Sequence, residues 1–140
     1  MDENELLFRI YSMRGDIDYH KAEVLRRQLQ ANGNDTATMA AAKPGSEENA
    51  AVHILIGTWN TIAVLMRGVK ARDKIYEVNP ICSMYQVLQP GITYLRKATP
   101  EIAVDFEKLN VDYHAWLKKK KKSASYVSAA CNDQMNARFG

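Results

Sequence analysis

The sequence predicts an all-α fold, a small antiparallel helical bundle of about four main helices. Apolar residues recur at steps of three and four positions through most of the chain, which is the spacing of the buried face of a helix. Residues that begin and end helices, such as Thr99-Pro100 and Asn32-Gly33, stand at the ends of these segments. The 140 residues, 46% hydrophobic and 25% charged, match a globular domain with one core. We therefore expect residues 1–122 to form a single helical domain.

The first predicted helix covers about residues 3–31, with Gly15 as the site of a bend. Its apolar stripe consists of Leu6, Leu7, Ile10, Met13, Ile17, Val24, Leu25 and Leu29. After Asn32-Gly33 ends this helix, the small and polar residues of 32–46 predict a mobile internal loop with one helical turn around residues 36–42.

A second helix is predicted to start at Ser46, whose hydroxyl can cap it, and to run to Arg67-Gly68. Between residues 50 and 66 it contains no Asp, Glu, Lys or Arg, but this stretch is shorter than the ~20 residues that span a bilayer. We expect it to be the buried helix at the centre of the bundle. His53 is then expected to be a neutral imidazole hydrogen-bonded inside the core.

Two further segments complete the second half of the predicted domain. A short helix over residues 72–77 should stop at Asn79-Pro80. The third main helix follows over residues 81–95, and Pro90 should kink or divide it.

The fourth main helix is predicted to begin at Pro100, with Thr99 as its cap, and to end in the five lysines Lys118–Lys122. Residues 123–140 show no sustained period. They are expected to form a flexible C-terminal tail, disordered or weakly helical.

The two cysteines, Cys82 and Cys131, belong to no C-x-x-C pair and predict neither a disulfide framework nor a zinc site. A reducing cytoplasm is the simplest setting for such a chain. The acidic start Met1–Glu5 also lacks the basic region of a signal peptide. Cys82 is interpreted as a small buried residue, because no histidine is adjacent to it in sequence.

Three segments and one arginine form a further pattern: Trp59–Val69, Leu88–Ile92 with Arg96, and Leu109–Trp116. This pattern resembles an uncharacterised bacterial helical family, the domain of unknown function numbered forty-seven sixty. The resemblance covers roughly Leu6 to Trp116 and implies an all-α fold with no established activity. Members often carry an N-terminal membrane helix, which is not expected here. They also often have an acidic residue at the position of Asn60.

The lysine run is the clearest binding feature. Its members are Lys118, Lys119, Lys120, Lys121 and Lys122. Removing these five from the 19 basic side chains leaves 14 against 16 acidic ones, so the basicity of the chain is local. Five ammonium groups can contact successive phosphates of a nucleic acid, and the flanking Trp116 and Tyr126 can stack on bases. The alternative interpretation is a solvated helix end that complements the helix dipole.

Two Asp-Tyr-His tripeptides contain potential metal ligands, at residues 18–20 and 112–114. Asp16 and His20 are four positions apart and would share a helix face, but two ligands do not make a site. No residue is predicted to be catalytic, to bind a cofactor or to ligate a metal.

The sequence favours a non-enzymatic macromolecular-interaction protein that binds another protein through its helix faces. Arg67, Tyr94 and Arg96 are the candidate interface residues, since Arg and Tyr are frequent at interface hot spots. Nucleic-acid binding through the lysine run is the alternative. A small metal-dependent enzyme built around His20 or His114 is the third hypothesis. Amphipathic stripes fit a monomer and a homodimer equally well.

Overall fold

The computed structural model describes residues 1–120, 131, 133, 134, 136 and 137. It confirms the all-α prediction, because these residues form helices and no strands. The helices of the described residues are α1 (Glu3–Arg14), α2 (Ile17–Ala31), α3 (Thr36–Ala41), α4 (Glu47–Met66), α5 (Asp73–Val78), α6 (Ile81–Leu95) and α7 (Val104–Lys120). These seven replace the predicted four main helices, since the first of those is divided and two short helices join them.

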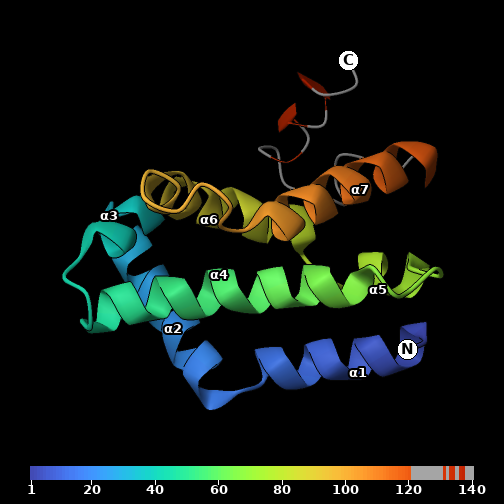
Figure 1. The fold of residues 1–140 in the computed structure, drawn as a ribbon, viewed down its shortest axis with the longest axis horizontal. Helices are drawn as coiled ribbons and strands as arrows, with labels where there is room; N and C mark the ends of the chain where they lie inside the picture. The colour runs from blue at the N-terminus through green and yellow to red at the C-terminus, as the bar shows by residue number, and fades with distance from the viewer. Residues whose placement is uncertain (121–130, 132, 135, 138–140) are drawn as a thin grey trace.

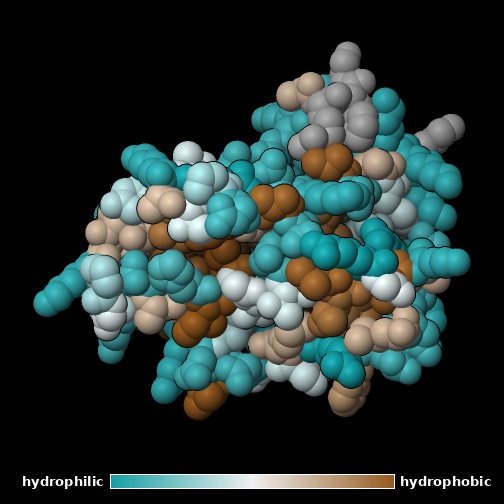
Figure 2. Space-filling model, in the orientation of Figure 1, coloured by the Kyte–Doolittle hydropathy of each residue, from teal (hydrophilic) through white to brown (hydrophobic). Residues whose placement is uncertain are grey.

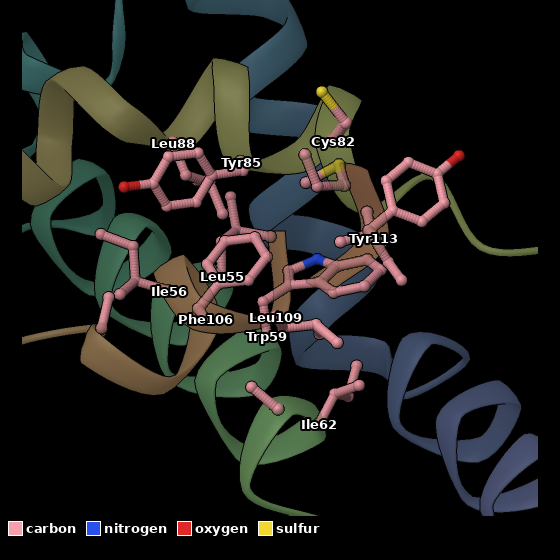
Figure 3. Packing of buried hydrophobic residues seen from close by; sticks show 14 of the residues in the cluster. Leu55, Ile56, Trp59, Ile62, Cys82, Tyr85, Leu88, Phe106, Leu109 and Tyr113 are labelled. Atoms are coloured by element: carbon pink, nitrogen blue, oxygen red, sulfur yellow. The ribbon is translucent and has the colours of Figure 1, made fainter. Parts of the chain in front are cut away.

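Helix α4 lies in the middle of the molecule, between α1 on one side and α6 and α7 on the other, and α2 crosses it (Figure 1). Its side chains Val52, Leu55, Trp59 and Ile62 are almost fully buried, as predicted for the central helix. Figure 3 shows Trp59 among the apolar side chains of α4 and α7, and its ring stacks on Phe106 at a centroid distance of 5.8 Å. The core therefore gathers around one face of α4.

The prediction for His53 is wrong, because this residue is exposed on α4 and not inside the core. Most residues of α4 are apolar, so the prediction could not tell from the sequence that His53 lies on the exposed face of the helix. By length and composition alone α4 could also cross a membrane, a test that core helices of soluble proteins pass as well. Here it packs against α1, α2, α3, α6 and α7.

The predicted first helix is two helices, α1 and α2, separated at Gly15-Asp16. Asp16 has extended backbone and its carboxylate accepts hydrogen bonds from the N–H groups of Asp18 and Tyr19, at 2.9 and 3.4 Å. Asp16 is thus the N-cap of α2. Because Asp16 caps a new helix, α1 ends before it and the chain changes direction. Only a bend in one helix was predicted here.

Helix α3 lies within the segment predicted to be a loop with one helical turn. The hydroxyl of Thr36 donates to the carbonyl of Val87 at 2.8 Å and accepts from the N–H of Gly91 at 2.9 Å. It therefore bridges a carbonyl and an N–H of α6 that an α-helix normally pairs with each other. Helix α6 continues through Pro90 to Leu95 without dividing, and a kink at Pro90 stays a prediction.

The start of α7 differs from the prediction. The helix begins at Val104 and not at Pro100, because Ala103 adopts a left-handed conformation with φ of 59° that no helix continues through. The side chain of Asn60, on α4, accepts a hydrogen bond from the N–H of Phe106 at 3.0 Å. The Asn60 side chain therefore caps the N-terminus of α7, a role that was predicted for Thr99. An acidic side chain at position 60 would accept the same bond.

The predicted absence of a disulfide is wrong, because Cys82 and Cys131 are bonded to each other. Fold topology, which the spacing of 49 positions does not reveal, brings the first turn of α6 next to Cys131. The tail prediction for residues 123–140 falls largely outside the described residues, and those described are helical. A cytoplasmic location stays a prediction that no longer draws support from the cysteines.

Candidate interaction groove

A groove of about 530 Å³ lies in the corner between α1 and α2. Both helices present one wall to it, and Val78 and Asn79, which follow one another at the end of α5, close one side. We call this the α1–α2 groove. Its walls are formed by Leu7, Tyr11, Arg14, His20, Val24 and Arg27.

Large apolar side chains are exposed in and around the α1–α2 groove. Tyr11 and Val78 line it with 78% and 65% of their surface exposed. Phe8 on α1 and Ile17 on α2 are 71% and 65% exposed. Figure 2 shows apolar groups between hydrophilic ones, one of them at the corner where α1 meets α2. Exposed apolar residues gathered in one place indicate an interaction surface.

Arg14, the last residue of α1, is a charged group in the α1–α2 groove. Its guanidinium lies over the ring of Trp59, 5.4 Å from the centroid, and donates to the side chain of Asn79 at 3.3 Å. Its Nε is buried without a hydrogen-bond partner. Within the described part of the chain no carboxylate forms an ion pair with Arg14. A half-buried cation in this state favours an anionic group from outside.

The carboxylate in the same groove, Glu23, is already neutralised. It accepts two hydrogen bonds from buried Arg26, at 2.9 and 3.3 Å, and pairs with Arg27 at 3.4 Å. Its side chain is 10% exposed. The groove therefore has a positive balance, centred on Arg14.

The floor of the groove includes the phenol of Tyr19. Burial raises the pKa of Tyr19 above its ordinary value of 10.0, and the hydrogen bond from the Trp59 indole, at 2.9 Å, opposes this rise. The phenol is neutral at physiological pH. It contributes a fixed hydrogen-bonding group at the base of the groove.

The described lysines of the predicted run, Lys118, Lys119 and Lys120, are exposed at the end of α7. Lys121 and Lys122 lie outside the described residues, as does the flanking Tyr126. Lys120 is 3.7 Å from the carboxylate of Asp73, which also accepts the indole N–H of Trp116 at 2.6 Å. The indole hydrogen bond is the main cause that lowers the pKa of Asp73.

Trp116, proposed as a stacking side chain, already packs within the protein. Its ring contacts those of Tyr76 and Tyr113 at centroid distances of 5.2 and 6.0 Å. Stacking on a base would have to compete with these contacts and with the bond to Asp73.

The three candidate interface residues do not share one contact surface. Arg67 pairs with Asp105 and Arg96 pairs with Glu107 at 2.7 Å, so both arginines hold the first turn of α7. Arg96 also donates to the carbonyl of Ile102 at 2.8 Å. Tyr94 is 37% exposed and lines a separate depression of about 430 Å³ beside α3.

The residues of the metal hypothesis are placed apart. Asp16 is occupied as the cap of α2, and His20 lies in the groove wall. His114 is fully buried beside Cys82, while Asp112 faces Arg72 and Lys108. In the residues described, no three potential ligands gather closely enough to hold an ion.

Sequence reasoning missed both the α1–α2 groove and the cysteine pair. One signal for the groove is visible afterwards: Phe8 and Tyr11 are large and apolar but lie off the stripe that was assigned to the core. Asp16 directly after Gly15 is a second signal, since it is a strong N-cap. The spacing of the two cysteines does not indicate that they pair.

Comparison with known protein families, with characterised proteins and with solved structures finds no match to this chain. The resemblance to the domain of unknown function stays a prediction.

Proposed function

We propose that this protein is a non-enzymatic binding protein that recognises another protein through the α1–α2 groove. The observation that carries the proposal is the combination of exposed apolar side chains with Arg14, whose charge has no carboxylate partner among the described residues. Tyr and Arg are frequent among the few residues that supply most of the affinity at protein interfaces.

The occupant we propose is an amphipathic helix of the partner. Two helices that meet at a corner form an apolar groove, which is a common receptor for such a helix. One or two apolar side chains of the partner would fill the space between Tyr11 and Val24. An Asp or Glu on the same face would reach Arg14 and supply the missing charge.

Site-specific photocrosslinking tests this proposal. The variant Tyr11→p-benzoylphenylalanine places the reactive group in the groove, and Val104→p-benzoylphenylalanine is the matched control on α7, where the side chain is 52% exposed. We expect a partner protein joined at position 11 and absent at position 104. Mass spectrometry should locate the crosslink in a helix-forming segment that contains Asp or Glu.

Arg14→Gln in the Tyr11 crosslinking variant separates specific from nonspecific capture. The crosslinked product should fall at least fivefold, because a charged interfacial hydrogen bond contributes about 1–3 kcal/mol. Equal crosslinking at positions 11 and 104, or no effect of Arg14→Gln, would overturn the proposal. A crosslink to a second copy of this chain would make the protein a homodimer and remove the need for a different partner.

Nucleic-acid binding is the second candidate, and the exposure of Lys118–Lys120 supports it. Fluorescence anisotropy of labelled duplex DNA and single-stranded RNA, at several salt concentrations, compares the intact protein with a variant in which all five lysines become Gln. Binding with a steep salt dependence that the variant loses would establish this function. Absence of binding at low salt would reduce the run to a solvated helix end.

A further inference from the structure

The lysine end of α7 packs on α5. The carboxylate of Asp73, the first residue of α5, accepts the indole N–H of Trp116 at 2.6 Å and lies 3.7 Å from Nζ of Lys120. The ring of Trp116 also packs against that of Tyr76, with 5.2 Å between the centroids. In Figure 1 α5 and the end of α7 lie at the same end of the molecule, where α4 ends. The lysines of α7 therefore share one surface with α5 and with the segment that joins α4 to α5.

That joining segment and α5 are rich in basic side chains. Residues 67–77 contain four basic side chains and two acidic ones. The two arginines among them are occupied by ion pairs with aspartates of α7. The two lysines, Lys70 and Lys74, are exposed, and neither forms an ion pair with a carboxylate of the described residues. We call Lys70, Lys74 and Lys118–Lys120 the basic surface.

The carboxylates of α5 and its contacts do not cancel this charge. Asp73 is engaged with Trp116 and Lys120, and Glu3 accepts the backbone N–H of Lys74 at 3.0 Å. Glu77 is exposed on α5. The five exposed lysines therefore outnumber these three carboxylates, and the basic surface carries an excess of positive charge that attracts polyanions.

The aromatic rings beside the basic surface are not available to stack on bases. Tyr76 and Tyr113 are each 4% exposed, and the ring of Trp116 packs on both. Sites for single strands combine positive charge with aromatic side chains that stack on successive bases. A duplex keeps its bases stacked inside and presents one negative charge per ~1.7 Å of its axis. The basic surface therefore suits a duplex better than a single strand.

A membrane surface fits less well than a duplex. Stable binding to a membrane needs an apolar or lipid anchor in addition to basic residues. The large exposed apolar side chain of α5 is Val78, and it lines the α1–α2 groove. The basic surface thus offers charge without an anchor.

We propose that the basic surface binds the phosphate backbone of a duplex nucleic acid and does not read its sequence. Each lysine contacts a phosphate and releases counterions, and contacts of this kind carry no sequence information. The inference rests on the second candidate function and extends it in two ways. Lys70 and Lys74 belong to the site together with the lysine run, and the nucleic acid is double-stranded.

The salt dependence of duplex binding tests the part of Lys70 and Lys74. Fluorescence anisotropy measures the binding of a labelled DNA duplex to the intact protein and to the double variant Lys70→Gln/Lys74→Gln at several salt concentrations. Each phosphate contact contributes about 0.9 to the slope of the logarithm of the binding constant against the logarithm of the salt concentration. We expect the double variant to bind more weakly, with a slope smaller by about 1.8. An unchanged slope would refute the proposal.

A matched control makes the same change of charge at the other end of α4. Lys21 and Lys43 are exposed; Lys21 lines a depression together with Glu47, the first residue of α4, and Lys43 lies in the loop before it. Helix α4 has 20 residues, which span about 30 Å, several times the distance over which salt screens charges. Lys21→Gln/Lys43→Gln should therefore keep the slope of the intact protein. Equal losses in the two double variants would show that net charge alone drives binding, and the proposal would fail.

Competition tests the form of the bound polymer. Unlabelled duplexes of two unrelated sequences should displace the labelled duplex equally well. A single strand of the same length should displace it less well, because its charge density is lower. A single strand that competes better than the duplex, or a strong preference for one sequence, would contradict the proposal. So would vesicles of phosphatidylcholine and phosphatidylserine that compete better than the duplex at equal negative charge, since they would assign the basic surface to a membrane.

The variant without the five lysines of the run separates this inference from the second candidate function. If that variant loses duplex binding while Lys70→Gln/Lys74→Gln binds like the intact protein, nucleic-acid binding stands and the shared surface is refuted. If the intact protein binds no duplex at low salt, both are refuted.

Discussion

Two glycines of this chain should respond in opposite ways to the same substitution. A Cβ atom added to Gly91, on α6, would lie 3.0 Å from the backbone oxygen of Thr36 and 3.1 Å from a methyl group of Val52. A Cβ atom added to Gly57, on α4, would meet nothing within 4 Å. Both residues lie inside helices with ordinary helical backbone.

The magnitudes follow from helix propensity and from packing. Replacement of a helical glycine by alanine stabilises a helix by about 0.5–1 kcal/mol, and this is the whole expected effect of Gly57→Ala. Gly91→Ala gains the same amount, but overpacking of a filled core costs about 1–3 kcal/mol. The backbone of α3 must also move, which weakens the two hydrogen bonds of the Thr36 hydroxyl. We expect a net destabilisation of about 1–2 kcal/mol.

Urea unfolding followed by far-ultraviolet circular dichroism measures both changes in the free energy of unfolding. Thermal unfolding gives a second measure, since 1 kcal/mol corresponds to about 3 °C in a chain of this size. Comparison of the two variants cancels the common propensity gain. A Gly91→Ala protein as stable as Gly57→Ala would refute the close approach of α3 to α6.

Three further outcomes are expected. Cys131→Ser should lower the free energy of unfolding by about 4 kcal/mol, the loop-entropy value for a disulfide that closes about 50 residues, and dithiothreitol should leave that variant unchanged while it destabilises the unaltered protein. Asn60→Ala should lose about 1 kcal/mol as a missing helix cap, whereas Asn60→Asp should keep the stability, and equal losses in urea unfolding would contradict this role. The indole N–H resonance of Trp116 should shift with a midpoint below pH 3.8, because Asp73 has a lowered pKa in the folded state. The stabilising contribution of Asp73 is present above its unfolded pKa and is lost as the pH falls through its folded pKa, so a midpoint above 3.8 would contradict the contact.

Local signals predicted those helices whose ends are set by local contacts. Ser46 caps α4 as expected, and its hydroxyl accepts from the N–H of Asn49 at 3.3 Å. The end of α5 before Asn79-Pro80 and the span of α6 over residues 81–95 also agree with the sequence patterns. In each case the residues that decide the boundary lie within four positions of it.

The errors occur where a residue far away in the sequence determines a helix boundary or a contact. The beginning of α7 depends on Asn60, which lies 46 positions before its partner Phe106, and the cysteine pair depends on the fold that brings Cys131 next to Cys82. The α1–α2 groove likewise requires the corner at Asp16, since on one continuous helix its two walls would not face each other. Periodicity reports which face of a helix is apolar, but not which neighbour covers it.

The cap that Asn60 provides has a consequence for the order of folding. A peptide with only residues 99–120 still contains the cap signal of Thr99-Pro100 and would be free to begin its helix there. In the intact protein that local preference is overruled, and Val104 becomes the first helical residue. Because the overruling group is on α4, α7 can acquire its native start only after the two helices have met. The first turn of α7 thus depends on a tertiary contact with α4. Formation of this turn during refolding would show when α7 docks on α4.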